Sequence, residues 1–375
     1  MKFSITNSAQ DTHRQVIGGW LFVTAIVVFA MVVVGGITRL TQSGLSMVEW
    51  APLFGILPPI GVDAWQTVFE KYQQFPEYQK INFGMSLEEF KFIFWWEYGH
   101  RVLGRIIGLV FFVPFAFFLL KGWLNRQWSL RFAGLLVLGG LQGVLGWYMV
   151  VSGLVDDPHV SQYRLTAHLI LAVAIYGLLL WYAFDFIYGT RQPRFDSTVF
   201  WTGLLPCVVL LMIVTGGFVA GTKAGFIINT FPTMNGEWIP TGLWVMTPGW
   251  RNLFENVITI QFVHRCMAVV VMLVATIAVV FTLKKAPESS SLGADMVVAS
   301  VLIQILLGIA TLMYKVPVLL GATHQAGALF VLAASLYMAH AVRRQRTKLE
   351  QTKEIDKLVE EMTAQLMEVA DNQHK

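Results

Sequence analysis

The chain has 375 residues, of which 55% are hydrophobic and 13% are charged, and its formal net charge is +4. Soluble domains are about a quarter charged, so this composition excludes an ordinary soluble enzyme and indicates a protein of the lipid bilayer. A helix that crosses the hydrocarbon core needs roughly 20 mostly apolar residues. We therefore predict an all-α integral membrane protein with eight transmembrane helices, at about residues 16–37, 92–120, 130–151, 165–187, 198–220, 257–283, 294–314 and 317–341.

The loops between these spans indicate the orientation of the chain, because lysine and arginine are retained on the cytoplasmic side of a membrane. Basic residues follow the second, fourth, sixth and eighth spans: Lys121, Arg126, Arg131, Arg191, Arg194, Lys284, Lys285, Arg343, Arg344, Arg346 and Lys348. The short loops on the other side carry Asp156, Asp157 and Arg164 in one case and Lys315 in the other. Both termini are therefore predicted to be cytoplasmic. The net positive charge reflects this topology and does not indicate a nucleic-acid partner.

The N-terminus gives an expectation about the location of the protein, and the cysteines give one about disulfide bonds. The first fifteen residues lack the apolar core of a signal peptide, so we expect no cleavable leader and predict a multi-pass protein of a bacterial inner (plasma) membrane. Cys207 and Cys266 both fall inside predicted spans, where a buried thiol usually acts as a small hydrophobe. We expect no structural disulfide.

The two halves of the chain are similar to each other, which indicates an internal repeat of four helices. The segment GGITRLTQSGLS from Gly35 ends the first span, and GGFVAGTKAGFI from Gly216 ends the fifth. Each is followed by a long outer segment rich in Pro, Gly and Trp, at 38–90 and at 221–255. Further matches in the same order pair His100-Arg101 with His264-Arg265, Gln142 and Gly146 with Gln304 and Gly308, and His168 with His324.

An even number of spans in each repeat gives both halves the same orientation in the membrane. The sequence thus predicts two tandem, pseudo-symmetric four-helix bundles, each able to enclose a cofactor between facing helices. The predicted domains are residues 1–190, residues 191–341 and a polar cytoplasmic tail at 342–375. Apolar residues of the tail alternate at spacings of 4 and 3, as in a short coiled coil, although a solvated amphipathic helix is favoured because barely two heptads are present. These residues are Ile355, Val359, Met362, Leu366 and Val369.

Four of the eight histidines occupy repeated positions in the outer part of even-numbered spans. They are His100, His168, His264 and His324, whereas His13 and His374 lie in the termini, His159 in an outer loop and His340 at the cytoplasmic end of the last span. Polar groups inside a membrane cost free energy and commonly mark function. A single such histidine is as well explained by a hydrogen bond to a neighbouring helix. Four in repeated positions, two per bundle, indicate ligands in one layer.

Two histidines per bundle suit haem better than zinc. Zinc sites use three or four nitrogen, sulfur or carboxylate ligands, and neither bundle offers a nearby cysteine or a histidine-rich cluster. Haem iron needs only axial ligands, and a flat porphyrin fits between facing helices with one histidine on each side. Arg101, Arg105 and Arg265 are candidates to pair with haem propionates or, equally, to snorkel to the membrane interface.

The two bundles differ beside their first histidine. Three residues before it, the first half has Glu97 and the second half has Gln261. Residues three apart share a helix face, so a carboxylate accompanies His100 and only an amide accompanies His264. A carboxylate beside a redox iron can move protons.

We therefore assign catalysis to the first bundle and a resident haem to the second. The predicted catalytic residues are Glu97, His100 and His168. The alternative for Glu97 is an ordinary ion-pair partner of Arg101 or Arg105.

At these residues the chain resembles the haem A synthase family, in its proteobacterial and mitochondrial branch. The resemblance covers most of residues 16–341 and includes the segments GGITRLTQSGLSMVEWAPLFGILPP, FKFIFWWEYGHRVLGR, GLQGVLGWYMVVSGL, RLTAHL, VHR and THQ. It implies oxidation of the C8 methyl of haem O to the formyl group of haem A, for cytochrome oxidase.

The resemblance also implies roles for individual residues. His264 and His324 would bind a haem b cofactor, His100 and His168 would lie at the haem O site, and Glu97 would be essential there. The implied partners are haem O supplied by a protohaem farnesyltransferase, an electron donor and cytochrome oxidase assembly factors, and a homo-oligomer is left open. Some members carry cysteine pairs in their outer loops, and this chain departs from that pattern.

Two other functions remain as alternatives. A di-haem membrane electron-transfer protein would use the same histidines, but such carriers commonly place haems near both membrane faces, whereas these four share one face. A membrane transporter is the non-enzyme alternative, disfavoured because even-numbered repeats do not invert in the membrane.

Overall fold

The computed structural model describes residues 2–48, 57–151, 159–189, 195–285 and 287–373. Eight of its helices are long and apolar enough to cross a membrane, which confirms the all-α architecture and the predicted spans. They are α1 (Lys2–Leu40), α4 (Leu87–Leu120), α5 (Arg126–Val151), α6 (Gln162–Tyr188), α7 (Ser197–Gly221), α9 (Val257–Lys285), α10 (Pro287–Met313) and α11 (Val318–Gln373). Some residues used in the sequence analysis lie outside the described ranges: 49–56, Asp156, Asp157, Arg191, Arg194 and His374.

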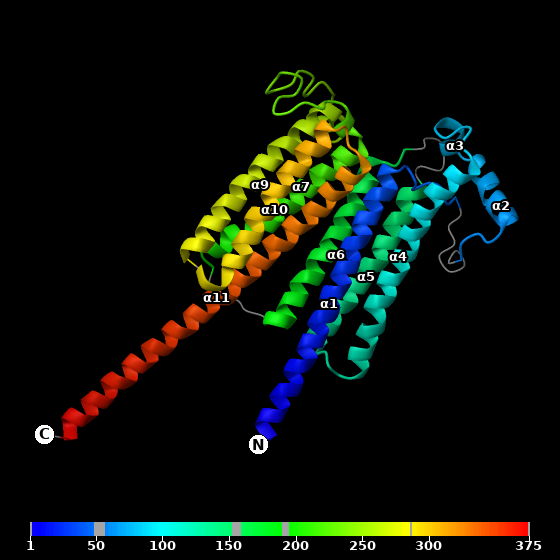
Figure 1. Ribbon diagram of the computed structural model, residues 1–375. Helices are drawn as coiled ribbons and strands as arrows, with labels where there is room; N and C mark the ends of the chain where they lie inside the picture. Colours follow the sequence, from blue (N-terminus) through cyan, green and yellow to red (C-terminus); the bar gives the residue numbers. More distant parts are fainter. Residues whose placement is uncertain (1, 49–56, 152–158, 190–194, 286, 374–375) are drawn as a thin grey trace.

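The first and last of these helices run well beyond the predicted spans. α1 begins at Lys2, and α11 continues to Gln373, so the polar tail extends the last span directly (Figure 1). Neither extension contains Pro or Gly, the residues that most strongly disfavour a helix. Ile355, Val359 and Met362 are exposed on the extension of α11, whereas the side chains of 366 and 369 are outside the described part.

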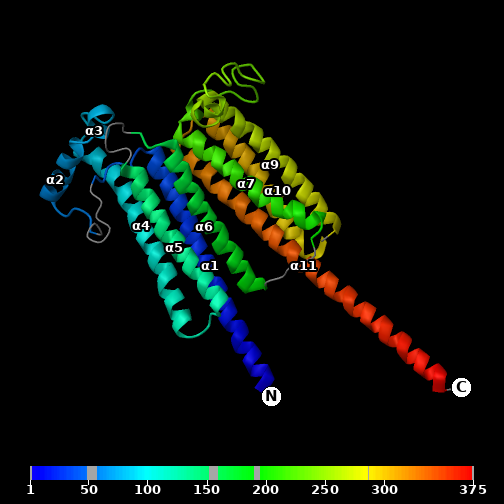
Figure 2. The ribbon, with the colours of Figure 1, turned by 180° about the vertical axis from the view of Figure 1, so that it is seen from behind.

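The eight long helices form two groups of four, as Figures 1 and 2 show from opposite sides. In the first group α1 packs against α4 and α6, and α5 packs against the same two helices. In the second group α7 packs against α9 and α11, and so does α10. The groups meet where α11 contacts α1 and α6, and where α6 contacts α7. This matching order of neighbours favours the tandem pseudo-symmetry, which stays a prediction.

The N-terminus and the end of α11 lie on one side of the helical body, and the segments 41–48, 57–86 and 222–256 lie at the opposite end, which we call the outer end (Figure 1). Near the end of α6 that is remote from the outer end, His340 of α11 is buried with its Nε2 3.2 Å from Oδ1 of Asp185. This polar pair links the two groups inside an otherwise apolar and aromatic core. Pairing lowers the cost of placing both groups in a membrane.

The two cysteines are free thiols, which confirms that they form no disulfide. The expectation that they are buried is wrong, because Cys207 of α7 and Cys266 of α9 are both exposed on the protein surface. Within a bilayer that surface faces lipid, so a thiol there still has apolar surroundings.

A cap of two short helices covers the outer end of the first group. α2 (Val62–Gln73) and α3 (Pro76–Lys80) lie beside the start of α4 (Figure 2). α4 begins with a capping box, in which Ser86 and Glu89 bind each other's backbone amides. Tyr72 of α2 packs against Phe90 of α4, with ring centroids 5.0 Å apart. The outer segment of the second group contains only short turns of helix: η1 (Ala224–Phe226), η2 (Gly249–Arg251) and α8 (Asn252–Glu255).

The cap contains a buried carboxyl group, Glu77, which the sequence did not single out. Glu77 is 4% exposed and accepts a hydrogen bond from the Tyr72 hydroxyl at 3.1 Å. Asn82 donates to the same hydroxyl oxygen at 2.8 Å. Burial raises the pKa of Glu77 from its ordinary 4.5 to about 8; the Tyr72 hydrogen bond acts against this shift, and the nearby Glu97 charge acts with it.

We expect the cap to lose stability as the pH rises from about 4.5 to about 8. In this range the folded cap holds a proton on Glu77 that the unfolded cap has released. The equilibrium constant for unfolding of the cap therefore increases with pH, by at most about tenfold per pH unit. Hydrogen exchange of the amides of 62–82, corrected for the intrinsic rate, measures this loss. Glu77→Gln should flatten the pH profile, and equal slopes in the variant and the parent protein would contradict the assignment.

Candidate functional site

The four histidines singled out by the sequence lie near the outer end of four different helices. His100 lies on α4, His168 on α6, His264 on α9 and His324 on α11. Each of these helices begins at the outer end, and each histidine lies within about four turns of that beginning. The imidazoles of His100 and His168 are near enough to interact electrostatically, and so are those of His264 and His324. The structure thus brings together the two predicted pairs.

Each histidine ring packs against a glycine of a neighbouring helix. A Cβ built on that glycine would lie 2.9–3.3 Å from the ring Cε1, which is closer than nine in ten real Cβ contacts. Glycine therefore lets the ring lie against the helix backbone without a shift of either. The pairs are Gly35 with His100, Gly146 with His168, Gly216 with His264 and Gly308 with His324.

Two glutamines at matched positions hold the backbone beside the second histidine of each pair. Gln142 Nε2 donates to the carbonyl oxygen of His168 at 3.0 Å, and Gln304 Nε2 donates to that of His324 at 2.9 Å. Gln142 Nε2 also lies 3.2 Å from Nε2 of His168. Both glutamines were matched positions in the sequence repeat, which indicated no role for them. In the structure they bind the backbone of His168 and of His324.

His264 is the histidine whose ring is oriented by a further side chain, Thr215 of α7. Thr215 Oγ1 lies 2.8 Å from His264 Nδ1 and donates its own proton to the Met212 carbonyl at 2.8 Å. The hydroxyl therefore accepts the Nδ1–H of His264, which leaves the lone pair of Nε2 for a metal. Val34 stands at the matching position of the first half. Sequence analysis missed Thr215, although this mismatch between the repeats could have revealed it.

Each of the remaining three rings has one buried nitrogen without a partner in the described part of the chain. Nδ1 of His100, of His168 and of His324 is buried and has no hydrogen-bond partner within the described ranges. An unpaired buried nitrogen is costly, so such atoms are expected where a ligand supplies the missing contact.

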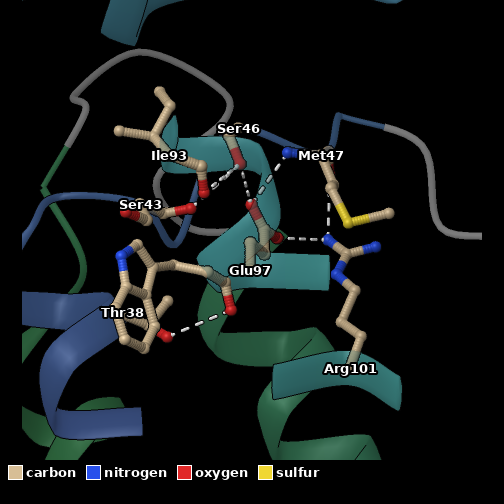
Figure 3. A network of polar contacts seen from close by, with 8 residues as sticks. Thr38, Ser43, Ser46, Met47, Ile93, Glu97 and Arg101 are labelled. Carbon is tan, nitrogen blue, oxygen red and sulfur yellow. Dashed lines mark hydrogen bonds and ion pairs between the residues drawn. The ribbon is translucent and has the colours of Figure 1, made fainter. Parts of the chain in front are cut away.

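Glu97 anchors the outer segment of the first bundle to α4 (Figure 3). Its Oε2 accepts hydrogen bonds from the Ser46 hydroxyl and from the Met47 amide, both at 2.8 Å. Its Oε1 accepts from Arg101 Nη2 at 2.6 Å, and the same guanidinium donates to the Met47 carbonyl at 2.9 Å. Glu97 is 3% exposed. The carboxylate and the arginine together hold both backbone groups of Met47.

The second bundle uses an amide in the same place. Gln261 Nε2 donates to the carbonyl of Ile228 at 2.9 Å, and Arg265 Nη2 donates to the same carbonyl at 3.3 Å. Ile228 follows Gly216 by as many residues as Met47 follows Gly35, so the two anchors match in the repeat. The exchange of Glu for Gln therefore changes an acceptor of a backbone N–H into a donor to a backbone C=O.

These contacts bear on two predictions. Glu97 has the ion-pair partner, Arg101, that its structural alternative required, and it lies one turn from His100 on the same helix. Arg101 and Arg265 hold outer-segment carbonyls, a role that the sequence did not suggest, and Arg105 lies one turn further along α4. Catalysis by Glu97 and contact of the arginines with propionates stay predictions.

The chain is similar to known proteins over most of its length. Residues 18–336 match the family model described as cytochrome oxidase assembly protein (COX15-CtaA). The chain is 51% identical over 334 residues to the heme A synthase of Nitrosospira multiformis, covering 87% of this chain and 93% of that protein. It is 46% identical over 334 residues to the heme A synthase of Parvibaculum lavamentivorans, covering 89% and 96% of the two chains. The corresponding values for that of Nitrosomonas eutropha are 43% over 348 residues, covering 89% and 97%. The chain therefore belongs to the COX15-CtaA family of cytochrome oxidase assembly proteins, as its resemblance predicted.

Proposed function

We propose that this protein is a haem A synthase, a membrane oxidoreductase that converts the C8 methyl of haem O to the formyl group of haem A for cytochrome oxidase. The observation that carries the proposal is the 51% identity to a protein of that name over 87% of the chain. The two histidine pairs support it, because each pair would hold one porphyrin between facing helices.

The second bundle, residues 191–341, is suited to a resident haem b. Thr215 accepts the proton of His264 Nδ1 in our assignment, which leaves Nε2 for the iron, and His324 of the same bundle has a buried Nδ1 without a partner in the described residues. Gly216 and Gly308 leave both rings close to their neighbouring helices. Haem iron held by two imidazoles supplies one-electron redox chemistry. The residues present therefore fit this cofactor.

The first bundle, residues 1–190, would bind haem O as substrate between His100 and His168. Oxidation of a methyl carbon releases protons, and a buried carboxylate beside the porphyrin can accept them. Glu97 is placed for this role one turn from His100, where Ser46, Met47 and Arg101 hold its carboxylate in a single orientation. We assign proton acceptance to Glu97 and orientation of Glu97 to these neighbours.

The proposal includes a place for the protein in the cell. It would lie in the bacterial inner membrane with both termini cytoplasmic and the haem sites toward the outer face. Haem O would come from a protohaem farnesyltransferase, a separate donor would supply electrons, and haem A would go to the oxidase under assembly. The tail, residues 342–375, would lie in the cytoplasm.

The resident haem is tested by removing its ligands one at a time. His264→Leu and His324→Leu should each abolish the low-spin haem b spectrum of the purified protein. Thr215→Val, which copies Val34, should keep the spectrum and weaken haem b binding about 10–100-fold, because a ligating histidine loses the hydrogen bond that orients it. Spectral titration measures both effects. His159→Leu, in an exposed position, is the control, and full haem b in both ligand variants would show that the pair is misassigned.

The enzymatic assignment is tested by following haem O in purified protein and separating the extracted haems by chromatography. The parent protein should form haem A, whereas bound haem O that stays unconverted would favour the electron-transfer alternative. Glu97→Gln copies Gln261 and keeps the side-chain shape, so it should retain haem b and lose haem A formation by about 100-fold or more, the usual contribution of a general base.

A second variant separates chemistry from anchoring at Glu97. Ser46→Ala removes one hydrogen bond to the carboxylate and leaves its charge, so haem A formation should stay near the parent rate. A normal rate in Glu97→Gln, or equal losses in both variants, would show that Glu97 acts only as an anchor of the outer segment.

The orientation is tested with reporter fusions. A reporter that is active only outside the cytoplasm should work when inserted in 221–255 and should be inactive when fused after Arg346, because the basic loops lie on the side of the tail. An active fusion at the tail would reverse the orientation and place the four histidines at the cytoplasmic face.

A further inference from the structure

One face of α5 in the first bundle carries glycines where the second bundle carries bulky residues. Gly139, Gln142, Gly143 and Gly146 follow one another at helical spacing, so they share a face. Gln142 binds the His168 carbonyl, and Gly146 lies against the His168 ring. This face therefore looks into the first bundle, and we call it the glycine face.

The glycine face has an apolar counterpart on α10. When Gln142 is aligned with Gln304, Gly139 corresponds to Val301 and Gly143 to Ile305. Val301 is buried in the core, and Ile305 packs against it. The second bundle thus fills with side chains the space that the first bundle leaves open.

The structure leaves this part of the face uncovered. Gly139 and Gly143 are both exposed, and a Cβ built on either would have no atom within 4 Å. α4 and α5 also contact each other much less than their counterparts α9 and α10 do. Along the helix axis, Gly143 and Gly139 lie about 5 Å and about 10 Å from Gly146, toward the middle of the membrane.

Buried polar atoms at the head of the glycine face indicate that a ligand belongs there. Nδ1 of His100, Nδ1 of His168 and Oε1 of Gln142 are buried, and none has a hydrogen-bond partner within the described ranges. The glycine face begins at this cluster and continues from it into the membrane interior.

We propose that the glycine face receives the isoprenoid side chain of haem O, with Gly139 and Gly143 as the residues that select for it. This inference rests on the proposed function. Haem O differs from haem b in carrying a long apolar hydroxyethylfarnesyl chain in place of a vinyl group, so a site for haem O needs an apolar slot beside the porphyrin. A resident haem b needs none, and Val301 and Ile305 occupy that place in the second bundle.

A second copy of the chain is the competing occupant, because Gly139 and Gly143 form a G-x-x-x-G motif that can pair helices. The orientation of the face argues against it. Gln142 lies between these glycines in sequence and shares their face, and its side chain points at His168 of its own bundle.

The test compares the retention of haem O and of tail-free protohaem by the purified full-length protein, measured by extraction and chromatography. Protohaem in the first bundle is counted as the amount above the one equivalent per chain that the second bundle would hold as haem b. Gly143→Ile, which copies Ile305, should lower haem O retention by about tenfold or more, since overpacking excludes the chain. It should leave protohaem retention and the haem b of the second bundle unchanged. Gly140→Leu copies the exposed Leu302 on a neighbouring face and should behave as the parent protein.

Three outcomes in Gly143→Ile would contradict the proposal that the glycine face receives the isoprenoid chain. These outcomes are unchanged haem O retention, equal loss of haem O and protohaem, and a changed oligomeric state with normal haem O retention. If Gly143→Ile fails to assemble with haem b, Gly143→Ala replaces it and should show a smaller loss of haem O alone; no loss would overturn the slot. A parent protein that retains haem O without converting it would contradict the proposed function and leave the slot supported.

Discussion

A polar group inside a membrane must find its partner within the protein, because the hydrocarbon core offers none, and an unsatisfied group costs roughly 1–3 kcal/mol or more. Several polar groups of the described spans follow this constraint. His340 pairs with Asp185, and Thr24, Thr202 and Thr311 each donate to a carbonyl of the preceding turn. The buried atoms without a partner in the described residues include Nδ1 of three of the four histidines, where the proposed ligand would supply contacts. Each of the four histidine rings also lies against a glycine, which lets the ring approach the backbone of the neighbouring helix.

The two bundles show how one scaffold serves two purposes through changes at single positions. Thr215 orients His264, whereas Val34 leaves His100 without this hydrogen bond. Gln261 donates to the outer segment, whereas Glu97 accepts from it and carries a charge. Under the proposed function, these exchanges suit a firmly held cofactor in the second bundle and an exchangeable substrate in the first. α5 and α10 also differ at matched positions, because α5 has glycines where α10 has apolar side chains.

The outer segments are tied to the helices at the positions that matter for the site. Met47 is held through both its backbone groups by Glu97 and Arg101, and Ile228 is held by Gln261 and Arg265. The cap on the first bundle also packs its aromatic side chains against α4 and against Met47. The cap is therefore in contact with the residue that Glu97 holds, one turn from His100. The buried Glu77 adds a titratable group to this layer, with its pKa raised to about 8 by burial.

The amino-acid sequence by itself determined the eight spans, the repeat and the four histidines, because apolar length, charge in loops and matched motifs are local properties of the chain. It also paired the histidines by bundle, since equivalent positions in a repeat occupy equivalent places. The sequence alone did not decide which partner each polar group has. That Glu97 binds Met47, that Thr215 orients His264, that Glu77 is buried and that the two cysteines face outward depend on contacts between distant segments. Only the tertiary structure decides these contacts, because helix periodicity places a side chain on a face but does not specify which neighbour that face meets.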